Sequence, residues 1–295
     1  MCWKRLLKFI TQDNMTDTLY RRKIVNTLEA FSSLCEREGF RWFMAFGSAI
    51  GAVRHGGIIP WDDDVDVYMP REDFNKLLAA KVPEGFEVLT YRTTPGLPFS
   101  YAKFSDTTST IWEMKKYPFV TGTFVDVFPL DSVPSDKAQA YRKVFSKRLY
   151  AYKKGIRRTD FSSWAASGLH DKLVAIRDIF WYRPLKRLNM ARLKTLEEKL
   201  STQSGDKYIV YDNIYSDAKV LYDKELFSGV QVADFEGLKV PLPSGNDALL
   251  TQIYGDYMTP PPEDKRTSGH QSYYINVEER YSVGEVRKLK KEAAK

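Results

Sequence analysis

The chain has few of the residues that hold small or metal-stapled folds together. Its 295 residues include only two cysteines and three histidines. Two cysteines are too few for the disulfide framework of a small secreted domain, and with so few histidines they do not favour a structural zinc site. These scarcities indicate a reduced protein, which we expect in the cytoplasm.

Long apolar runs are lacking as well. No stretch approaches the roughly 20 apolar residues that span a bilayer, so we expect no transmembrane helix. The basic N-terminus has scattered apolar positions and no small-residue cleavage site, and we do not expect it to be a signal peptide. Trp3, Leu6, Leu7 and Ile10 form a short apolar stripe beside basic residues. This stretch is either a frayed terminus or a helix lying on the inner face of the membrane.

What the chain does contain is the composition of an ordinary globular protein, with 43% hydrophobic and 14% aromatic residues and no internal repeat. Its net charge of +7 is unevenly spread, because residues 141–158 and 183–194 are basic whereas residues 62–66 are acidic. A basic surface favours an anionic partner such as nucleotide phosphates, nucleic acid or a membrane face, and a solvated helix face is the alternative.

Apolar periodicity and turn residues predict mixed strands and helices, and therefore an α/β or α+β fold. The expected strands cover residues 40–46, 63–69, 86–91, 99–106 and 123–129, followed by a hairpin over 230–243 with its turn at Glu236-Gly237. The expected helices run from Thr16 or Asp17 to Gly39, over 49–55, over 70–80, through 135–200 with breaks near 155–168 and at Pro184, and just before 254–262. We divide the chain into an N-terminal helical region (1–39), a catalytic core (40–134), a basic helical region (135–222) and a C-terminal hairpin and helix (223–295) that complete the site.

The stretch PWDDDVDV, residues 60–67, concentrates four aspartates beside residues that favour burial. In a strand, Asp64 and Asp66 point to one face while Val65 and Val67 point to the other. Two carboxylates about 7 Å apart on one face repel each other unless a cation lies between them. Oxygen ligands of this kind suit Mg²⁺, with Mn²⁺ as an alternative.

A third carboxylate repeats this pattern, since Asp126 lies between Val125 and Val127 in another expected strand of the same sheet. Burying it is costly unless it joins the metal or takes up a proton. Asp62 has the same parity as Asp64 and is a further metal ligand, although an exposed turn explains Asp62 equally well.

The stretch FGSAIGAVRH, residues 46–55, lies upstream and predicts a strand end, a Gly-Ser pair and a helix. The N-terminus of a helix binds phosphate, Gly47 allows close approach of the backbone, and Ser48 adds a hydroxyl donor. An anion cradle, metal ligands and a positioned carboxylate are the parts that a phosphoryl or nucleotidyl transferase needs.

Residues 47–74, GSAIGAVRHGGIIPWDDDVDVYMPREDF, strongly resemble the signature of the LicD family of phosphocholine transferases, which decorate cell-surface glycans. FVDVFPLDSVP (124–134), and FEGLKVPLP (235–243) with YGDYMTPPP (254–262), resemble its other blocks. The resemblance implies a nucleotidyltransferase-like mixed sheet with flanking helices and a helical insertion. It also implies kinship with fukutin and fukutin-related protein, which transfer ribitol phosphate from CDP-ribitol; the zinc site of the latter is not expected here, since its cysteines are missing.

The activity that the resemblance implies is transfer of phosphocholine, or a related phosphoalcohol, from CDP-choline or another CDP-alcohol to a glycan hydroxyl, with release of CMP. We expect the glycans that accept the group to include lipid-linked ones, which are assembled at the inner membrane face. Mg²⁺ on Asp64 and Asp66 would bridge the diphosphate. Asp126 would be either a third ligand or the general base, and we favour the base.

Several basic and aromatic residues are candidates for contacts with the donor. Arg54 suits the diphosphate, His55 is either a second contact or a surface residue, and Lys103 matches a basic position of the family's donor site or is a solvated lysine. Arg71 is expected to pair with the acidic cluster and orient it. Tyr257 and the prolines at 260–262 are expected to close over the site, with Lys265 or Arg266 as a phosphate contact. Trp61, Trp112 and Tyr117 are candidates for a choline cage.

Three alternative functions share some of these features. A glycosyltransferase with a DxD motif would also bind a metal and a nucleotide sugar through Asp64 and Asp66, but it would need neither Gly47-Ser48 nor Asp126. A nucleotidyltransferase would use the same parts and differ in its products. A basic nucleic-acid-binding or membrane-binding module with an inactive core is the third alternative, and the intact acidic residues argue against it, so no nucleic-acid partner is expected.

Overall fold

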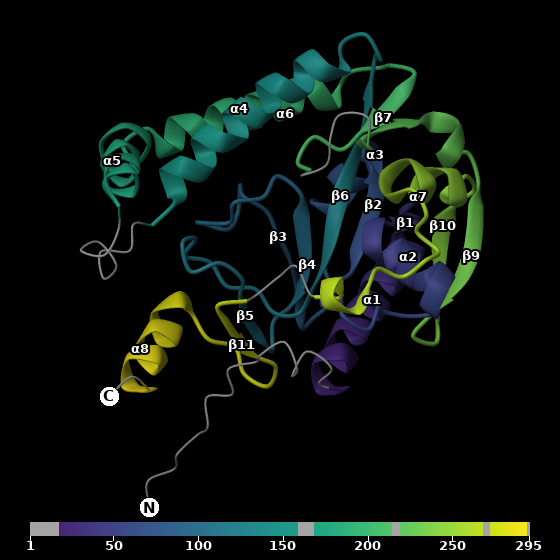
Figure 1. The fold of residues 1–295 in the computed structure, drawn as a ribbon, viewed down its shortest axis with the longest axis horizontal. Helices are drawn as coiled ribbons and strands as arrows, with labels where there is room; N and C mark the ends of the chain where they lie inside the picture. Colours follow the sequence, from purple (N-terminus) through teal and green to yellow (C-terminus); the bar gives the residue numbers. More distant parts are fainter. Residues whose placement is uncertain (1–17, 159–167, 214–218, 268–271, 294–295) are drawn as a thin grey trace, which may run out of the picture.

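The computed structural model describes residues 18–158, 168–213, 219–267 and 272–293, and a mixed sheet lies at its centre (Figure 1). The sheet has the strand order β1–β2–β6–β4–β3, and β7 and β8 extend it from the far end of β6. Only β2 and β6 pair in parallel. Its strands are β1 (Phe43–Met44), β2 (Asp66–Pro70), β3 (Phe86–Leu89), β4 (Ala102–Asp106), β6 (Phe124–Val133), β7 (Lys207–Ile209) and β8 (Leu221–Asp223). The predicted α/β (α+β) fold class is confirmed.

The long strand β6 joins the parts of this sheet. Its first residues pair with β4, its middle with β2, and Asp131 to Val133 pair with β7. Val125 and Val127 are fully buried, as are Val65 and Val67 on the β2 side. A strand with neighbours on both edges and helices against its faces reads as an almost continuous apolar run, which explains the sequence FVDVFPLDSV.

The helices surround the sheet and form an arm beside it (Figure 1). They are α1 (Thr18–Glu38), α2 (Phe46–His55), α3 (Arg71–Leu77), α4 (Ala138–Ile156), α5 (Leu169–Arg177), α6 (Lys186–Ser201), α7 (Asn246–Tyr254) and α8 (Val283–Ala293), with the π-helix η3 (Asp178–Tyr182) and the 3₁₀ turns η5 (Lys224–Phe227) and η6 (Glu263–Lys265). The apolar stripe of α1, formed by Ile24, Leu28, Phe31 and Leu34, is buried, and Phe31 packs edge-on against Phe104 of β4.

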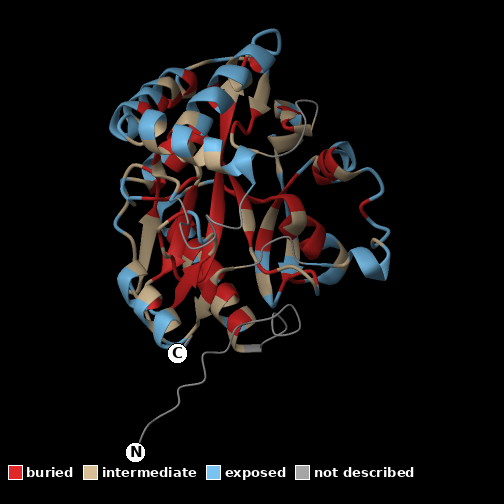
Figure 2. Cartoon of the chain, turned by 60° about the vertical axis from the view of Figure 1, so that its left-hand side comes forward, coloured by how far each residue is buried: buried red, intermediate tan, exposed pale blue. Residues whose placement is uncertain are grey.

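The helices of the basic region form the arm, whereas its residues 207–209 and 221–222 belong to β7 and β8 of the sheet. Helices α4 and α6 pack side by side, and α5 lies at the end of the pair that is remote from the sheet (Figure 1). The predicted breaks are confirmed, because α4 ends at Ile156 and α6 begins two residues after Pro184. Exposed residues cover much of the helical surface, whereas the sheet is buried (Figure 2). None of the described helices combines the length and apolar character needed to cross a membrane.

Two small β pairs complete the fold. The predicted hairpin is confirmed as β9 (Val230–Phe235) and β10 (Leu238–Pro243), and Glu236 and Gly237 both adopt positive φ, as a two-residue type I′ turn requires. The second pair, β5 (Thr110–Trp112) with β11 (Tyr274–Asn276), was not predicted. Three residues are too few to show the alternation by which a strand is recognised.

Candidate active site

The acidic cluster forms where β2 and β6 begin. The two strands are parallel neighbours, and Asp66 lies opposite Asp126 in their register. Asp64 lies just before β2, on the same side as Asp66, and the alternation of buried valines with partly exposed aspartates is that of an extended chain. One carboxylate oxygen from each of Asp64, Asp66 and Asp126 lies within 4.8 Å of the others. The structure therefore brings together the three carboxylates singled out in the sequence.

This proximity is electrostatically unfavourable for the protein alone. Burial, followed by the charges of Asp64, Asp126 and Asp62, raises the pKa of Asp66 well above its ordinary value. Burial also raises the pKa of Asp126 to about 7, against the opposing effect of Lys103. Carboxylates that raise one another's pKa in this way favour a cation among them, and an all-oxygen donor set fits Mg²⁺ or Mn²⁺.

Lys103 lies behind Asp126 and is completely buried in β4. Its Nζ donates to both carboxylate oxygens of Asp126, at 2.8 and 3.1 Å, and lies 3.3 Å from Oε2 of Glu113. Burial alone would lower the pKa of Lys103, but the two carboxylates outweigh it and raise that pKa. Lys103 is thus a charged partner of Asp126 and is not solvated. Glu113 was missed in the sequence, because nothing local marks it as the second partner of a lysine ten residues away.

Asp62 extends the cluster towards α2. One oxygen from each of Asp62, Asp63 and Asp64 also lies within 4.8 Å of the others, so Asp64 belongs to both groups. A Cβ built on Gly47 would lie 2.8 Å from Oδ2 of Asp62. A Cβ at this position would require the carboxylate of Asp62 to move, and the first turn of α2 therefore lies directly against the acidic cluster.

The N-terminus of α2 differs from its predicted form. Gly47 and Ser48 belong to the first turn of the helix and do not precede it, since α2 begins at Phe46, which adopts a φ of 45°. The expected strand over 40–46 is correspondingly short, with only Phe43 and Met44 in β1. Ser48 Oγ accepts a hydrogen bond from the backbone amide of Asp66 at 2.9 Å. That bond fixes the start of β2 against the helix end whose first-turn amides have no partner within the helix.

Comparison with known proteins agrees with this geometry. The family model "LicD/FKTN/FKRP, nucleotidyltransferase domain" matches residues 39–155, the segment that holds every part of the site described so far. The lipopolysaccharide cholinephosphotransferase LicD of Haemophilus influenzae is 32% identical over 278 residues, which cover 88% of this chain and 98% of that protein. The chain belongs to the LicD family.

A more distant relative matches a shorter part. Human ribitol 5-phosphate transferase FKRP is 35% identical over 65 residues, which cover 22% of this chain and 13% of that protein. The predicted membership of the LicD family, with its kinship to fukutin-related protein, is confirmed. The LicD match over most of the chain includes the helical arm, which carried little of the resemblance in the sequence.

Beyond the acidic cluster, a pair of arginines shares the ring of Trp61. The guanidinium carbons of Arg54 and Arg266 lie 6.0 and 5.3 Å from the centre of that ring. Arg54 donates to the backbone oxygen of Tyr257 and to Nε2 of His55. Burial and the charge of Arg266 lower the pKa of Arg54, and burial and the charge of Arg54 lower the pKa of His55. Two neighbouring cations on the ring of Trp61 repel each other, and an anionic ligand bound between them would relieve this repulsion.

Arg71 does not orient the acidic cluster, and that prediction is wrong. Its Nε and Nη2 each donate at 2.7 Å to Asp131, and its Nη1 donates at 3.1 Å to Glu197 of α6. Arg71 follows β2 directly and turns towards the arm. Its closeness to the aspartates along the sequence is not closeness in space.

Two of the three candidate cage aromatics are part of the core. Trp112 is 1% exposed and donates from Nε1 to the backbone oxygens of Met114 and Tyr117, and Tyr117 is itself 8% exposed. Neither side chain is open to a ligand, so the prediction that they line a choline cage is wrong. Trp61 is partly exposed beside Asp62 and keeps that candidate role. The N-terminal stripe from Trp3 to Ile10 lies outside the described residues.

Proposed function

We propose that the protein transfers phosphocholine, or a closely related phosphoalcohol, from CDP-choline to a hydroxyl of a cell-surface glycan and releases CMP. The observation that carries the proposal is the juxtaposition of Asp64, Asp66 and Asp126 at the start of two parallel strands. The similarity to a lipopolysaccharide cholinephosphotransferase supports the choice of alcohol and of acceptor class. We place the reaction in the cytoplasm, at the inner face of the membrane.

The carboxylates of Asp64 and Asp66 would hold a Mg²⁺ ion, or Mn²⁺, and Asp62 would assist from its place against Gly47. When bound, the cation neutralises the diphosphate of the donor and the charge that develops on the departing CMP. Without such a cation, the charges that raise the pKa of Asp66 would also repel the diphosphate. The cluster therefore suits a substrate that arrives with a metal.

The donor's phosphates would be positioned from two further directions. The first turn of α2 lies against Asp62 at Gly47, and its backbone amides, which have no partner within the helix, would donate to phosphate oxygens. Arg54 and Arg266 carry guanidinium groups suited to a second set of phosphate oxygens, and His55 is bonded to Arg54. The partly exposed Trp61, which precedes Asp62 in the chain, offers its ring to the choline ammonium.

Asp126 would act as the general base. A carboxylate with a pKa of about 7 is matched to accepting a proton from an attacking hydroxyl near neutral pH. The acceptor oxygen forms a bond to the phosphorus that carries choline, the bond from that phosphorus to the oxygen bridging to CMP breaks, and the proton passes to Asp126. Lys103 holds both oxygens of Asp126 from behind and fixes its orientation, which is an alternative to the direct donor contact expected from the sequence.

Calorimetric titration tests the donor. CDP-choline, CDP-ribitol, CDP-glycerol, UDP-glucose and ATP are each titrated with Mg²⁺ into the wild type and into Asp64→Asn/Asp66→Asn. We expect Mg²⁺-dependent binding of CDP-choline that the double variant loses. The matched control is Asp136→Asn, an exposed aspartate outside the site, which should bind like the wild type.

Other outcomes have definite meanings. Preference for CDP-ribitol would keep the reaction and change the alcohol, as the similarity to a ribitol 5-phosphate transferase allows. Preference for UDP-glucose or for ATP would replace the proposal by a glycosyltransferase or a nucleotidyltransferase. Release of CMP in the presence of a glycan acceptor, followed by chromatography, then distinguishes phosphoalcohol transfer from transfer of the nucleotide itself.

A further inference from the structure

An apolar stripe at the end of the arm faces solvent. Leu169, Leu173, Ile176 and Phe180 recur at intervals of four, three and four residues, so they share one side of a helix. They are 75%, 57%, 42% and 77% exposed, and the neighbouring Trp181 is 68% exposed. Helix α5 contains no buried residue at all. We call these five side chains the α5–η3 face. They have the spacing of a stripe that packs against a core, but no core formed by the described residues covers them.

The α5–η3 face is held outward by ionic contacts on the opposite side. Asp178, the first residue of η3, is only 2% exposed. It accepts a hydrogen bond from Arg177 at 3.0 Å and lies 3.4 Å from Nζ of Lys154 and 3.8 Å from Arg157, both of which belong to the arm's other side. The π-helix is therefore fixed to the arm through its one buried charge. Phe180 and Trp181 therefore project into solvent from a helix that is anchored to the arm.

Positive charge surrounds this face. Residues 169–188 carry five basic and two acidic side chains, and one of the two acids is Asp178, which its cationic neighbours neutralise. A groove of about 490 Å³ between α4 and η3 adjoins the face. Two lysines and two tyrosines are among the residues that line it, namely Lys143, Lys147, Tyr150 and Tyr182. Exposed Leu, Phe and Trp with Lys, Arg and Tyr around them are typical of helices that lie in an anionic lipid interface.

We infer that the α5–η3 face docks the protein on an anionic phospholipid bilayer, with Phe180 and Trp181 inserted at the boundary between headgroups and acyl chains. The surrounding cations match the charge of the lipid, whereas a protein partner or a second copy of this positively charged arm would need an acidic surface. Only the purpose of docking, access to a membrane-anchored glycan, rests on the proposed function. The lipid contact itself is inferred from the α5–η3 face alone.

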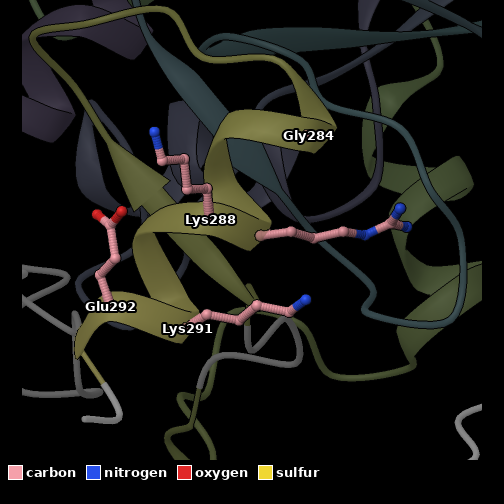
Figure 3. Close-up of a pocket in the computed structure, with 5 residues that line it drawn as sticks. Gly284, Lys288, Lys291 and Glu292 are labelled. Atoms are coloured by element: carbon pink, nitrogen blue, oxygen red, sulfur yellow. The ribbon is translucent and has the colours of Figure 1, made fainter.

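Helix α8 provides a matched contrast, since it is basic without being apolar. Lys288 and Lys291 extend from it beside Glu292 (Figure 3), and none of the large exposed hydrophobic residues of the described chain belongs to α8. If positive charge were sufficient for binding, both α8 and the α5–η3 face would bind lipid. If the apolar stripe is also required, only the α5–η3 face will bind lipid.

Sedimentation of the full chain with vesicles tests the inference. We expect binding to vesicles of equal parts phosphatidylglycerol and phosphatidylcholine, weak binding to phosphatidylcholine alone, and a blue shift of tryptophan emission that Trp181→Phe removes. Phe180→Ser/Trp181→Ser should weaken binding at least about tenfold, because each buried aromatic contributes substantially to partitioning. Lys172→Glu/Arg187→Glu should weaken it most at low salt. The controls Lys288→Glu/Lys291→Glu and Val230→Ser/Val232→Ser should stay within about twofold of the wild type.

Three results would overturn the inference. One is equal vesicle binding by Phe180→Ser/Trp181→Ser. Another is binding that disappears on deletion of residues 1–17 but survives the α5–η3 changes, which would assign the contact to the N-terminal stripe. A third is absence of vesicle binding together with a dimer that the same double variant dissolves, which would make the face an interface between two copies. Calorimetric binding of CDP-choline, measured on every variant, reports separately on the proposed function.

Discussion

Replacing Asp66 by asparagine should make the protein more stable once divalent cations are removed. Asparagine has nearly the same shape as aspartate but carries no charge, and Asp66 is the carboxylate on which burial and three neighbouring aspartates act together. At pH 8 in EDTA, the wild type must either keep this charge in the cluster without a metal ion or bind a proton there, and both cost stability. The Asp66→Asn variant lacks this carboxyl group and its charge, although it also lacks one metal ligand.

The neighbouring Asp126 gives the scale of the effect. Moving a carboxyl pKa from 3.8 to about 7 corresponds to roughly 4 kcal/mol of unfavourable interaction in the charged form. Part of this is burial, which asparagine shares, so we expect Asp66→Asn to raise the free energy of unfolding by about 2 kcal/mol. For a chain of 295 residues that gain corresponds to a rise in Tm of about 3 °C.

The pH dependence has a definite sign. Because the folded-state pKa of Asp66 is raised, the folded protein binds a proton more tightly than the unfolded chain does. The penalty is therefore fully present above the folded-state pKa, decreases as the pH falls below it, and disappears only below the ordinary carboxyl pKa of the unfolded chain. The advantage of the variant should be largest at pH 8 and should shrink at pH 5.

Thermal unfolding at pH 5 and pH 8, in EDTA and in excess Mg²⁺, measures all of these effects. At a Mg²⁺ concentration ten times the dissociation constant, the wild type should gain about 1.4 kcal/mol and Asp66→Asn much less. Asp136→Asn, with the same change in net charge, should follow the wild type. The reasoning fails if Asp66→Asn lowers the Tm in EDTA at pH 8, or if Mg²⁺ stabilises both proteins equally.

Three further substitutions address other parts of the site. Lys103→Met should lower the free energy of unfolding by about 3 kcal/mol in urea titrations, because it leaves the buried Asp126 and the partly buried Glu113 without their cation; an unchanged midpoint would contradict the pairing. Gly47→Ala should weaken Mg²⁺-dependent CDP-choline binding about tenfold in calorimetry, because its Cβ would displace the carboxylate of Asp62; unchanged affinity would exclude Asp62 as a ligand. Arg266→Gln should weaken CDP-choline binding about tenfold without affecting choline alone, since a charge-assisted phosphate contact is lost; equal losses for both would place Arg266 at the choline end.

The acidic site could be predicted because its signals are local. The alternation of aspartate with valine at Asp64 and Asp66, and again at Asp126, carries both the strand and the face on which the carboxylates lie. Local sequence does not show that the two strands are adjacent and parallel. Once they lie in one sheet, however, burying the valines on one face places the aspartates together on the other. Chemistry that follows from period-two patterning is accessible from the sequence.

What escaped prediction depends on contacts between distant segments. Lys103 and Asp126 meet because β4 runs beside β6, and neither residue's surroundings in the sequence indicate an ion pair. Arg71 pairs with Asp131, 60 residues further along the sequence, and with Glu197, 126 residues further along. Its closeness in sequence to the aspartates of residues 62–66 therefore did not predict its partners. The outward stripe of α5 has the same pattern as a buried one. Only the packed arm reveals which face is covered.

Arg71 also connects the proposed membrane contact to the chemistry. It follows β2, which begins at Asp66, and it bonds to Asp131 on β6, which carries Asp126. Its third bond reaches Glu197 on α6, which packs along α4 and leads to the α5–η3 face. The strands that hold the carboxylates and the arm that would rest on the bilayer are therefore joined through one buried guanidinium.

Replacing that guanidinium should separate stability, binding and orientation. Arg71→Met breaks both ion pairs and should lower the free energy of unfolding by about 3–5 kcal/mol, measured in urea. Vesicle binding and CDP-choline binding below the unfolding transition should survive, because neither surface contains Arg71. If the pair Arg71–Glu197 fixes the arm relative to the sheet, transfer to a membrane-embedded glycan should fall several-fold more than transfer to a soluble glycan fragment. Equal losses for the two acceptors would mean that the network stabilises the fold and does not orient the site above the membrane.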